Sequence, residues 1–297
     1  MSNVAERASV TIESAVSELA AMLDSSFFDS PSRIAADVVA ALLEVPRSWL
    51  SLNRSASVDA ATMKAASLAM TKLIQGAPFA YAVGSAAFRH LNLLVDERVL
   101  IPRPETEVLV GEILERFEKE FGGRSWGTAI DIGTGSGAIA LSLAAEGKFD
   151  RIVATDASKD ALDVASINCE RSSAALRAPV EFRHGSLLAP VKGIEATLIV
   201  SNPPYIAFSE AESLPASVRD WEPPLALICG GDGLAATAGI VRESGRNLVS
   251  GGLLALEVDE RRASLVAEMI MRHGGYRDVG VRLDLAGRER FVLAWRI

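Results

Sequence analysis

The first 78 residues repeat apolar side chains at intervals of three and four positions, which places them on one face of a helix. A start signal, Ser30-Pro31-Ser32, precedes the second repeat. A third helix is expected over residues 58–74, with Gly76 at its C-terminal cap and Pro78 ending it. The periodic residues of the first two helices are Val16, Leu19, Met22 and Leu23, then Ile34, Val38, Ala41 and Leu42. We predict an N-terminal helical bundle domain at residues 1–78, which either recognises a partner or supports the rest of the chain.

Residues 79–104 lose the helical period. Leu91, Leu93 and Val95 alternate with period two, which is typical of a half-buried strand. Gly84 and the pair Asp96-Glu97 offer places for the chain to turn. This pattern predicts a β-hairpin linker at residues 79–104.

The chain from residue 105 to 297 alternates apolar runs with helical stretches such as 138–145 and 159–168. The apolar runs cover residues 128–132, 151–155, 180–183, 197–201 and 253–258. Alternation of this kind predicts an α/β domain with a parallel sheet covered by helices on both faces. Two last strands, at 279–283 and 291–297 with Gly287 between them, predict an antiparallel hairpin at the sheet edge.

Composition narrows the class of protein. The 297 residues are 49% apolar and carry a net charge of -8, which argues against general nucleic-acid binding but suits a basic protein partner. Cys169 and Cys229 have no CxxC spacing, and His90, His184 and His273 have no ligand spacing, so we expect no metal. The N-terminus lacks a signal-peptide pattern and no apolar run is long enough to cross a bilayer, which predicts a cytoplasmic protein.

A glycine-rich turn follows the first strand of the α/β domain and opens a helix. Its sequence is Asp131-Ile132-Gly133-Thr134-Gly135-Ser136-Gly137, and Asp156 ends the next strand. Glycines let a ligand approach the backbone, and an acid at the end of the second strand can accept hydrogen bonds from a ribose. NAD and S-adenosylmethionine both fit such a turn, and a turn needed only for packing is a third alternative. Asp131 favours S-adenosylmethionine, because a carboxylate repels a pyrophosphate and suits a cationic methionine moiety.

The segment Asn202-Pro203-Pro204-Tyr205 ends the fourth apolar run, at the sheet edge where α/β folds bind ligands. The two prolines lack N–H donors but keep their carbonyls as acceptors. If Asn202 Oδ1 and the Pro203 carbonyl each accept one hydrogen of a planar NH2 group, the nitrogen lone pair can be aimed at a methyl sulfonium. Tyr205 offers a ring for stacking on a planar group. A rigid turn after a strand is the plainer alternative.

These motifs resemble those of the HemK/PrmC family, which methylates the glutamine N5 of the Gly-Gly-Gln motif in peptide chain release factors. The most discriminating match is the segment 99–107, which reads Val-Leu-Ile-Pro-Arg-Pro-Glu-Thr-Glu. The resemblance implies a Rossmann-like class I S-adenosylmethionine-dependent methyltransferase sheet, S-adenosyl-L-methionine as cofactor and a class 1 release factor as partner. Further matches are residues 76–81 with Gly84 and Phe88, 221–223, 230–234, Gly275, Tyr276, Asp284, Gly287 and Arg290.

The resemblance also implies roles for single residues. Asn202, Pro203, Pro204 and Tyr205 are the predicted catalytic and substrate-binding residues. The predicted cofactor-binding residues are Asp131, Gly133, Thr134, Gly135, Ser136, Gly137, Asp156, Ser186, Leu187 and Asn202.

This chain departs from the family pattern at three places. Many relatives have Asp at the position of Ser186, and they usually have Gly and Gln at the positions of Asp259 and Arg262. Arg103 and Glu105 either form an ion pair that braces the domain junction or reach the substrate.

Alternative functions remain open at this point. The Asn202–Tyr205 motif by itself also fits an adenine N6-methyltransferase acting on nucleic acid. A ribosomal-protein glutamine methyltransferase usually reads Pro-Arg-Ser-Pro where this chain has Pro-Arg-Pro-Glu at 102–105. A regulatory protein that only binds S-adenosylmethionine is the remaining alternative.

Overall fold

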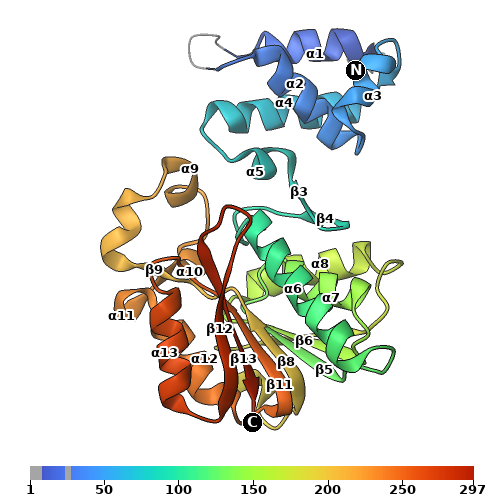
Figure 1. Ribbon diagram of the computed structural model, residues 1–297. Coiled ribbons are helices and arrows are strands. Elements are labelled where there is room, and N and C mark those ends of the chain that lie inside the picture. The colour runs from blue at the N-terminus through green and yellow to red at the C-terminus, as the bar shows by residue number, and fades with distance from the viewer. Residues whose placement is uncertain (1–8, 24–27) are drawn as a thin grey trace. The chain divides into compact units, whose positions relative to one another are not determined.

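The structure is a computed structural model that describes residues 9–23 and 28–297. The chain forms two compact units. The first holds the described residues up to Ser85 together with Ala216–Trp221, and the second holds Ala86–Pro215 and Glu222–Ile297. Figure 1 labels the helices and strands of both units.

Short helices around an apolar centre make up the first unit. Strands β1 (Val10–Thr11) and β2 (Ser57–Val58) pair antiparallel beside them. The helices are α1 (Ile12–Ala20), α2 (Pro31–Leu42), α3 (Arg47–Leu52), α4 (Ala60–Ile74), α5 (Phe79–Val83) and the separate turn α9 (Ala216–Arg219). Their core contains Leu19, Val38 and Met70, all fully buried. The three predicted helices are therefore confirmed as α1, α2 and α4, whereas α3 and α5 lacked a periodic signal.

Helix α4 starts two residues later than predicted. Asp59 takes the N-cap position, and its carboxylate accepts a hydrogen bond of 2.7 Å from the Thr62 amide. That cap fixes the start of the helix at Ala60 rather than at Val58, which pairs with Val10 in the small sheet.

The extended chain predicted from residue 79 is wrong for residues 79–83, which form helix α5. Pro78 precedes the helix with φ -55, and Gly84 ends it in the left-handed region at φ 76. One helical turn is too short for its apolar spacing to be distinguished from strand spacing. The two-stranded sheet that follows lies at β3 (Ser85–Phe88) and β4 (Leu91–Leu94).

A seven-stranded sheet forms the centre of the second unit, all of which the structure describes. The strand order is β12-β13-β11-β8-β5-β6-β7. The strands from β11 to β7 are parallel, and β13 pairs antiparallel with both β11 and β12. The strands are β5 (Thr128–Ile132), β6 (Arg151–Asp156), β7 (Val180–His184), β8 (Ala196–Ser201), β11 (Leu248–Glu257), β12 (Tyr276–Leu283) and β13 (Glu289–Arg296). The predicted parallel sheet and its antiparallel edge hairpin are confirmed.

Helices cover both faces of this sheet (Figure 1). Helices α6 (Pro104–Phe121), α7 (Ala138–Glu146) and α8 (Lys159–Arg171) lie on one side, and α12 (Ala235–Ser244) and α13 (Ala263–His273) on the other. Successive strand residues alternate between the two layers, so Ala129 packs with α6 and α7 while Ile130 packs with α12 and α13. Burial on both faces explains the nearly continuous apolar runs of the strands.

Shorter elements connect β8 to α12. After β8 the chain forms β9 (Ile206–Ala207), which pairs parallel with β10 (Ile228–Cys229). The other short elements of this connection are η2 (Phe208–Ser213), α10 (Pro224–Leu227) and α11 (Gly230–Gly233), whereas η1 (Ala189–Val191) lies between β7 and β8. In the described part of the chain, no helix has both the length and the apolar character needed to cross a membrane.

Candidate active site

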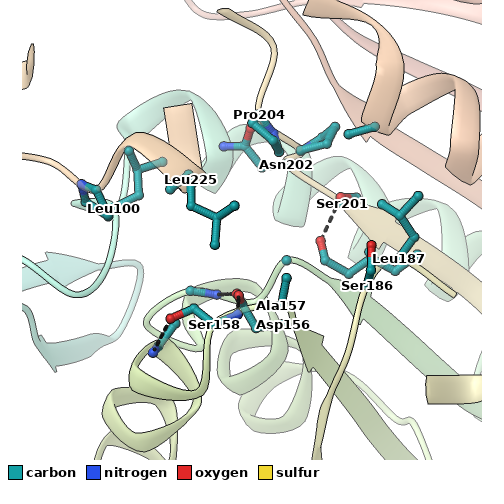
Figure 2. A pocket seen from close by; sticks show the side chains of 18 of the residues that line it. Leu100, Asp156, Ala157, Ser158, Ser186, Leu187, Ser201, Asn202, Pro204 and Leu225 are labelled. Atoms are coloured by element: carbon teal, nitrogen blue, oxygen red, sulfur yellow. Dashed lines mark hydrogen bonds between the residues drawn. The ribbon is translucent and has the colours of Figure 1, made fainter. Parts of the chain in front are cut away.

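A cavity lies at the carboxyl ends of strands β5, β6 and β8. The register places Ile132 beside Thr155 and Ser201, so the loops after these three strands start from one edge. Figure 2 shows Asp156 and Ser158 on one side of the cavity and Asn202 and Pro204 opposite them. Ser186 and Leu187 close a third side, and Leu100 and Leu225 a fourth (Figure 2). The cavity has a volume of about 240 Å³ and is partly open to solvent.

The glycine-rich turn presents bare backbone to this cavity. Gly133 and Gly135 line it, and both have positive φ, 73° and 55°. A Cβ at either position would meet no heavy atom within 4 Å, so the space in front of them is open. The Gly133 and Thr134 amides donate to the Thr155 carbonyl at 2.8 and 2.9 Å, which fixes the turn against β6. The predicted Thr134, Ser136 and Gly137 lie behind this wall rather than on it.

The Asp156 carboxylate stands at the cavity wall on a rigid support. Its Oδ2 accepts from the Gly135 amide and its Oδ1 from the Ser158 amide, both at 2.9 Å. Burial raises the pKa of Asp156, and these backbone hydrogen bonds oppose the rise. Each oxygen keeps acceptor capacity, so the carboxylate can receive hydroxyl donors from a ligand.

Asp131 lies one layer behind the glycine turn. It is fully buried, and its Oδ2 accepts from Thr134 Oγ1 at 2.7 Å and from the Ala140 amide at 3.2 Å. Its Oδ1 has no hydrogen-bond partner among the described residues. Burial raises the pKa of Asp131 to about 7. An acceptor oxygen in this state suits a cationic group or a bridging water.

Asn202, Pro203 and Pro204 line the opposite wall, as a single rigid segment after β8. Asn202 Nδ2 donates to Thr106 Oγ1 at 3.2 Å. Thr106 Oγ1 in turn donates to Glu257 Oε2 at 2.7 Å. With the nitrogen engaged in this way, the Asn202 Oδ1 acceptor is left for a ligand.

Tyr205 follows these residues but does not line the cavity in this structure. Burial, reinforced by the charge of Glu257, raises the pKa of Tyr205 to about 12, so its hydroxyl stays protonated. The Tyr205 backbone is covered by Gly233, which has φ +81. A Cβ at Gly233 would lie 2.2 Å from the Tyr205 carbonyl oxygen, so only glycine fits there.

Ser186 and Leu187 both line the cavity beyond strand β7. Leu187 holds a left-handed φ of 49°, which is unusual for a leucine. Helix α12 approaches it at Gly239, where a Cβ would lie 2.5 Å from Leu187 Cδ1. The absence of a side chain at Gly239 therefore lets Leu187 occupy the wall.

The departures at Asp259 and Arg262 belong to one ion-pair network. Arg262 Nη1 lies 3.3 Å from Asp259 Oδ1, and Arg262 Nη2 lies 2.9 Å from Glu210 Oε2. Arg262 Nε also donates to the Asp232 carbonyl at 2.7 Å. Glu210 accepts from the Ala207 amide at 3.0 Å, just after the Asn-Pro-Pro-Tyr segment. The two departures therefore tie the loop after β11 to the segments that flank this motif.

Arg103 and Glu105 have separate partners, so the structure does not pair them with each other. Arg103 Nη2 lies 2.5 Å from Glu222 Oε1, and the Glu222 side chain is 1% exposed. Glu222 Oε2 also accepts from the Ile101 amide at 3.3 Å. Glu105 pairs with Arg288 at 2.8 Å. Arg103 thus fixes the segment that brings Leu100 to the cavity.

Sequence reasoning missed Thr106 and Glu257 as parts of the site. The signal was present, because Thr106 occupies the apolar face of α6 together with Leu109, Val110 and Ile113. A polar residue on a buried helical stripe needs a buried partner. Arg98, Leu100 and Leu225 also line the cavity without having been predicted.

The histidines and cysteines lie outside this arrangement. His184 Nε2 contacts the Ala157 carbonyl at 3.0 Å, and His273 Nδ1 contacts the Gly274 carbonyl at 3.2 Å. Both cysteines are free thiols. Within residues 9–23 and 28–297, no group of three or more His, Cys, Asp or Glu side chains is arranged to hold a metal ion.

Comparison with known proteins identifies the class. A family model described as the methyltransferase small domain matches residues 106–215. A methyltransferase structure from Pyrococcus furiosus shares the fold, with 20% identity, a TM-score of 0.52, and 71% of this chain and 90% of that chain covered. The hMettl16 catalytic domain does so with 18% identity, a TM-score of 0.55, and 78% and 80% coverage. The fold is therefore that of a methyltransferase domain.

Curated relatives narrow the class further. Proteins named release factor glutamine methyltransferase are 42% identical over 228 residues in Moorella thermoacetica, covering 77% of this chain and 78% of that protein. The relative in Rhodopirellula baltica is 38% identical over 219 residues, covering 73% of each. The relative in Gloeobacter violaceus is 35% identical over 258 residues, covering 87% and 88%. The chain belongs to the release factor glutamine methyltransferase family, in agreement with its HemK/PrmC motifs.

Proposed function

We propose that this protein transfers a methyl group from S-adenosylmethionine to the side-chain amide nitrogen of the glutamine in the Gly-Gly-Gln motif of class 1 peptide chain release factors. One observation carries the proposal: the Asn202–Pro204 segment faces the same cavity as Asp156 and the glycine turn. A clamp for a planar nitrogen and a nucleoside-binding wall therefore share one space. The names of the relatives support the choice of glutamine as the acceptor.

The residues of the cavity fit the cofactor. Gly133 and Gly135 leave room for close approach, and Asp156 offers carboxylate acceptors for ribose hydroxyls. Asp131 Oδ1, which has no hydrogen-bond partner among the described residues, fits the ammonium of the methionine moiety through an intervening water. Ser186 and Leu187 would flank the adenine. When bound, S-adenosylmethionine supplies an electrophilic methyl group on a sulfonium.

The chain's own residues then hold and orient the nucleophile. Asn202 Oδ1 and the Pro203 carbonyl each accept one hydrogen of the substrate amide, which fixes the direction of the nitrogen lone pair. As positive charge develops on that nitrogen, both acceptors stabilise it. Positioning of this kind contributes several kcal/mol to catalysis. Tyr205, whose hydroxyl stays neutral, would offer its ring face for stacking on the planar amide.

The proposal includes where the protein acts. An acidic chain of net charge -8 suits a basic protein partner better than a stable nucleic-acid complex. A release factor works in the cytoplasm, so we propose that location for this enzyme and no membrane partner.

Methyl transfer from labelled S-adenosylmethionine to purified release factor tests the proposal. We expect labelling of the native factor and none of a factor in which the Gly-Gly-Gln glutamine is replaced by alanine. The Asn202→Ala variant should lose about 100-fold or more in kcat, as expected for removal of a transition-state acceptor. Labelling that survives the glutamine replacement would refute the proposal. Labelling of DNA or RNA in its place would favour the adenine N6 alternative.

A further inference from the structure

We propose that Thr106 and Glu257 act as positioning residues that decide which end of the Asn202 amide faces the cavity. This inference rests on the proposed function, because it concerns how the acceptor for the substrate amide is oriented. The observation behind it is a chain of two hydrogen bonds from Asn202 to Thr106 and from Thr106 to Glu257, which joins β8, α6 and β11.

The chain of hydrogen bonds has a direction. An asparagine amide has a donor end and an acceptor end of nearly the same shape, so packing alone does not select one of them. Only the orientation with Oδ1 toward the cavity can accept a hydrogen of the substrate. The reverse orientation would set two N–H groups against the substrate NH2.

The Glu257 charge supplies the selection. An ionised carboxylate can only accept, so the single proton of the Thr106 hydroxyl has to point toward Glu257. Thr106 Oγ1 then shows Asn202 a lone pair, which binds Nδ2 and rejects Oδ1. The ionised state of Glu257 therefore fixes the productive orientation of Asn202.

Protonation of Glu257 removes this selection. A neutral Glu257 can donate to Thr106 Oγ1, which frees the hydroxyl proton to point at Asn202. The reversed amide, with Oδ1 accepting from Thr106, then becomes equally well bonded. Transfer should therefore fall as Glu257 gains its proton.

The surroundings of Glu257 place its titration in the working range. Glu257 is buried, with 1% of its surface exposed, and this burial raises its pKa to about 7. The Thr106 hydrogen bond and the charges of Arg290 and Arg103 lower it, while Glu105 raises it. Tyr205 also faces it, with a hydroxyl that stays neutral. Since the pKa of Glu257 is raised, its ionised form is reached only as pH rises through about 7.

Four proteins test the inference: wild type, Thr106→Ser, Thr106→Val and Glu257→Gln. The measurements are kcat at saturating release factor from about pH 5.5 to about 9, and the Kd for S-adenosylmethionine by calorimetry. Serine is the matched control because it keeps the hydroxyl, whereas valine keeps the shape without it. Wild type and Thr106→Ser should lose activity as pH falls through about 7.

In Thr106→Val and Glu257→Gln we expect kcat at high pH to fall about twofold, because two equally bonded amide orientations leave about half of the protein in the productive one. In both variants, kcat should no longer fall as the pH drops through about 7. The Kd for S-adenosylmethionine should stay within about twofold of wild type. If Thr106 and Glu257 had a merely structural role, the two variants would change the stability of the protein but kcat would still fall below about pH 7. If Thr106→Val fails to fold, Glu257→Gln alone decides.

Two outcomes overturn the inference without touching the proposed function. One is a Glu257→Gln variant whose kcat falls below about pH 7 as the wild-type kcat does. The other is a Thr106→Val variant whose kcat equals that of Thr106→Ser. A wild-type protein that binds S-adenosylmethionine but methylates no release factor at any pH refutes the proposed function, and the inference with it.

Discussion

Alanine at position 239 should disturb the cofactor cavity from behind. Gly239 lies inside helix α12, and a Cβ there would sit 2.5 Å from Leu187 Cδ1. Real carbon contacts lie near 3.5–4.0 Å, so one of the two groups has to move. The helix backbone is held by its hydrogen bonds, whereas the Leu187 methyl is the free end of a side chain. We therefore expect Gly239→Ala to push Leu187 into the cavity.

The size of the effect follows from two opposed terms. Overpacking costs about 1–3 kcal/mol, and replacing a helical glycine by alanine returns about 1 kcal/mol. The net loss in the free energy of unfolding should therefore be about 0–2 kcal/mol. The cofactor has to push Leu187 back out of the cavity when it binds. If this costs about 1.4 kcal/mol of binding free energy, the Kd for S-adenosylmethionine rises roughly tenfold.

Isothermal titration calorimetry with S-adenosylmethionine measures this Kd without any protein substrate. Gly111→Ala is the matched control, because Gly111 also lies inside a helix and its Cβ would meet only Arg89 Nη1 at 3.5 Å. The control should bind normally and gain up to about 1 kcal/mol of stability. The Leu187→Ala substitution removes the displaced side chain. In that background, Gly and Ala at position 239 should give the same Kd for S-adenosylmethionine. The reasoning would be refuted if Gly239→Ala bound S-adenosylmethionine with the wild-type Kd. It would also be refuted if Gly239→Ala raised the Kd by the same factor when Leu187 is replaced by alanine.

Three further substitutions test other parts of the site. Without cofactor, the raised pKa of Asp131 means that its carboxyl stabilises the fold at low pH and loses this contribution as pH rises toward about 7. In urea unfolding, the free energy of unfolding of Asp131→Asn should therefore rise relative to that of wild type between about pH 4 and about 7. A difference between the two proteins that does not change with pH would contradict this. Arg262→Gln removes the contacts to Glu210 and the Asp232 carbonyl and should cost about 1–2 kcal/mol in thermal unfolding, so an unchanged melting temperature would argue against the network. Tyr205→Phe should keep kcat within about threefold in the release factor assay, because the hydroxyl stays neutral, and a large loss would assign it a chemical role.

The sheet was predictable because its strands are buried on both faces. A strand such as β8 has Leu198 in one layer and Ile199 in the other, so almost every position is apolar and the run stands out. The glycine turn and the Asn-Pro-Pro-Tyr segment were predictable for a related reason. Both directly follow such strands, and parallel strands end at one edge of the sheet.

Contacts between distant segments were not predictable. Thr106 and Glu257 are 151 positions apart, and only the packing of α6 on β11 joins them. The place of Asp131 behind the wall follows from strand alternation, which puts it in the layer of Ala129 rather than that of Ile130. The spacing to Gly133 carries no information about that choice of layer.

Locating the methyl group by tandem mass spectrometry tests the central claim most directly. Release factor is purified from cells with and without this protein, and from cells carrying Asn202→Ala. We predict that the glutamine of the Gly-Gly-Gln motif gains one methyl group on its side-chain nitrogen only where the intact protein is present. A glutamine methylated equally in all three samples, or a methyl group that this protein adds to another residue, would contradict the account.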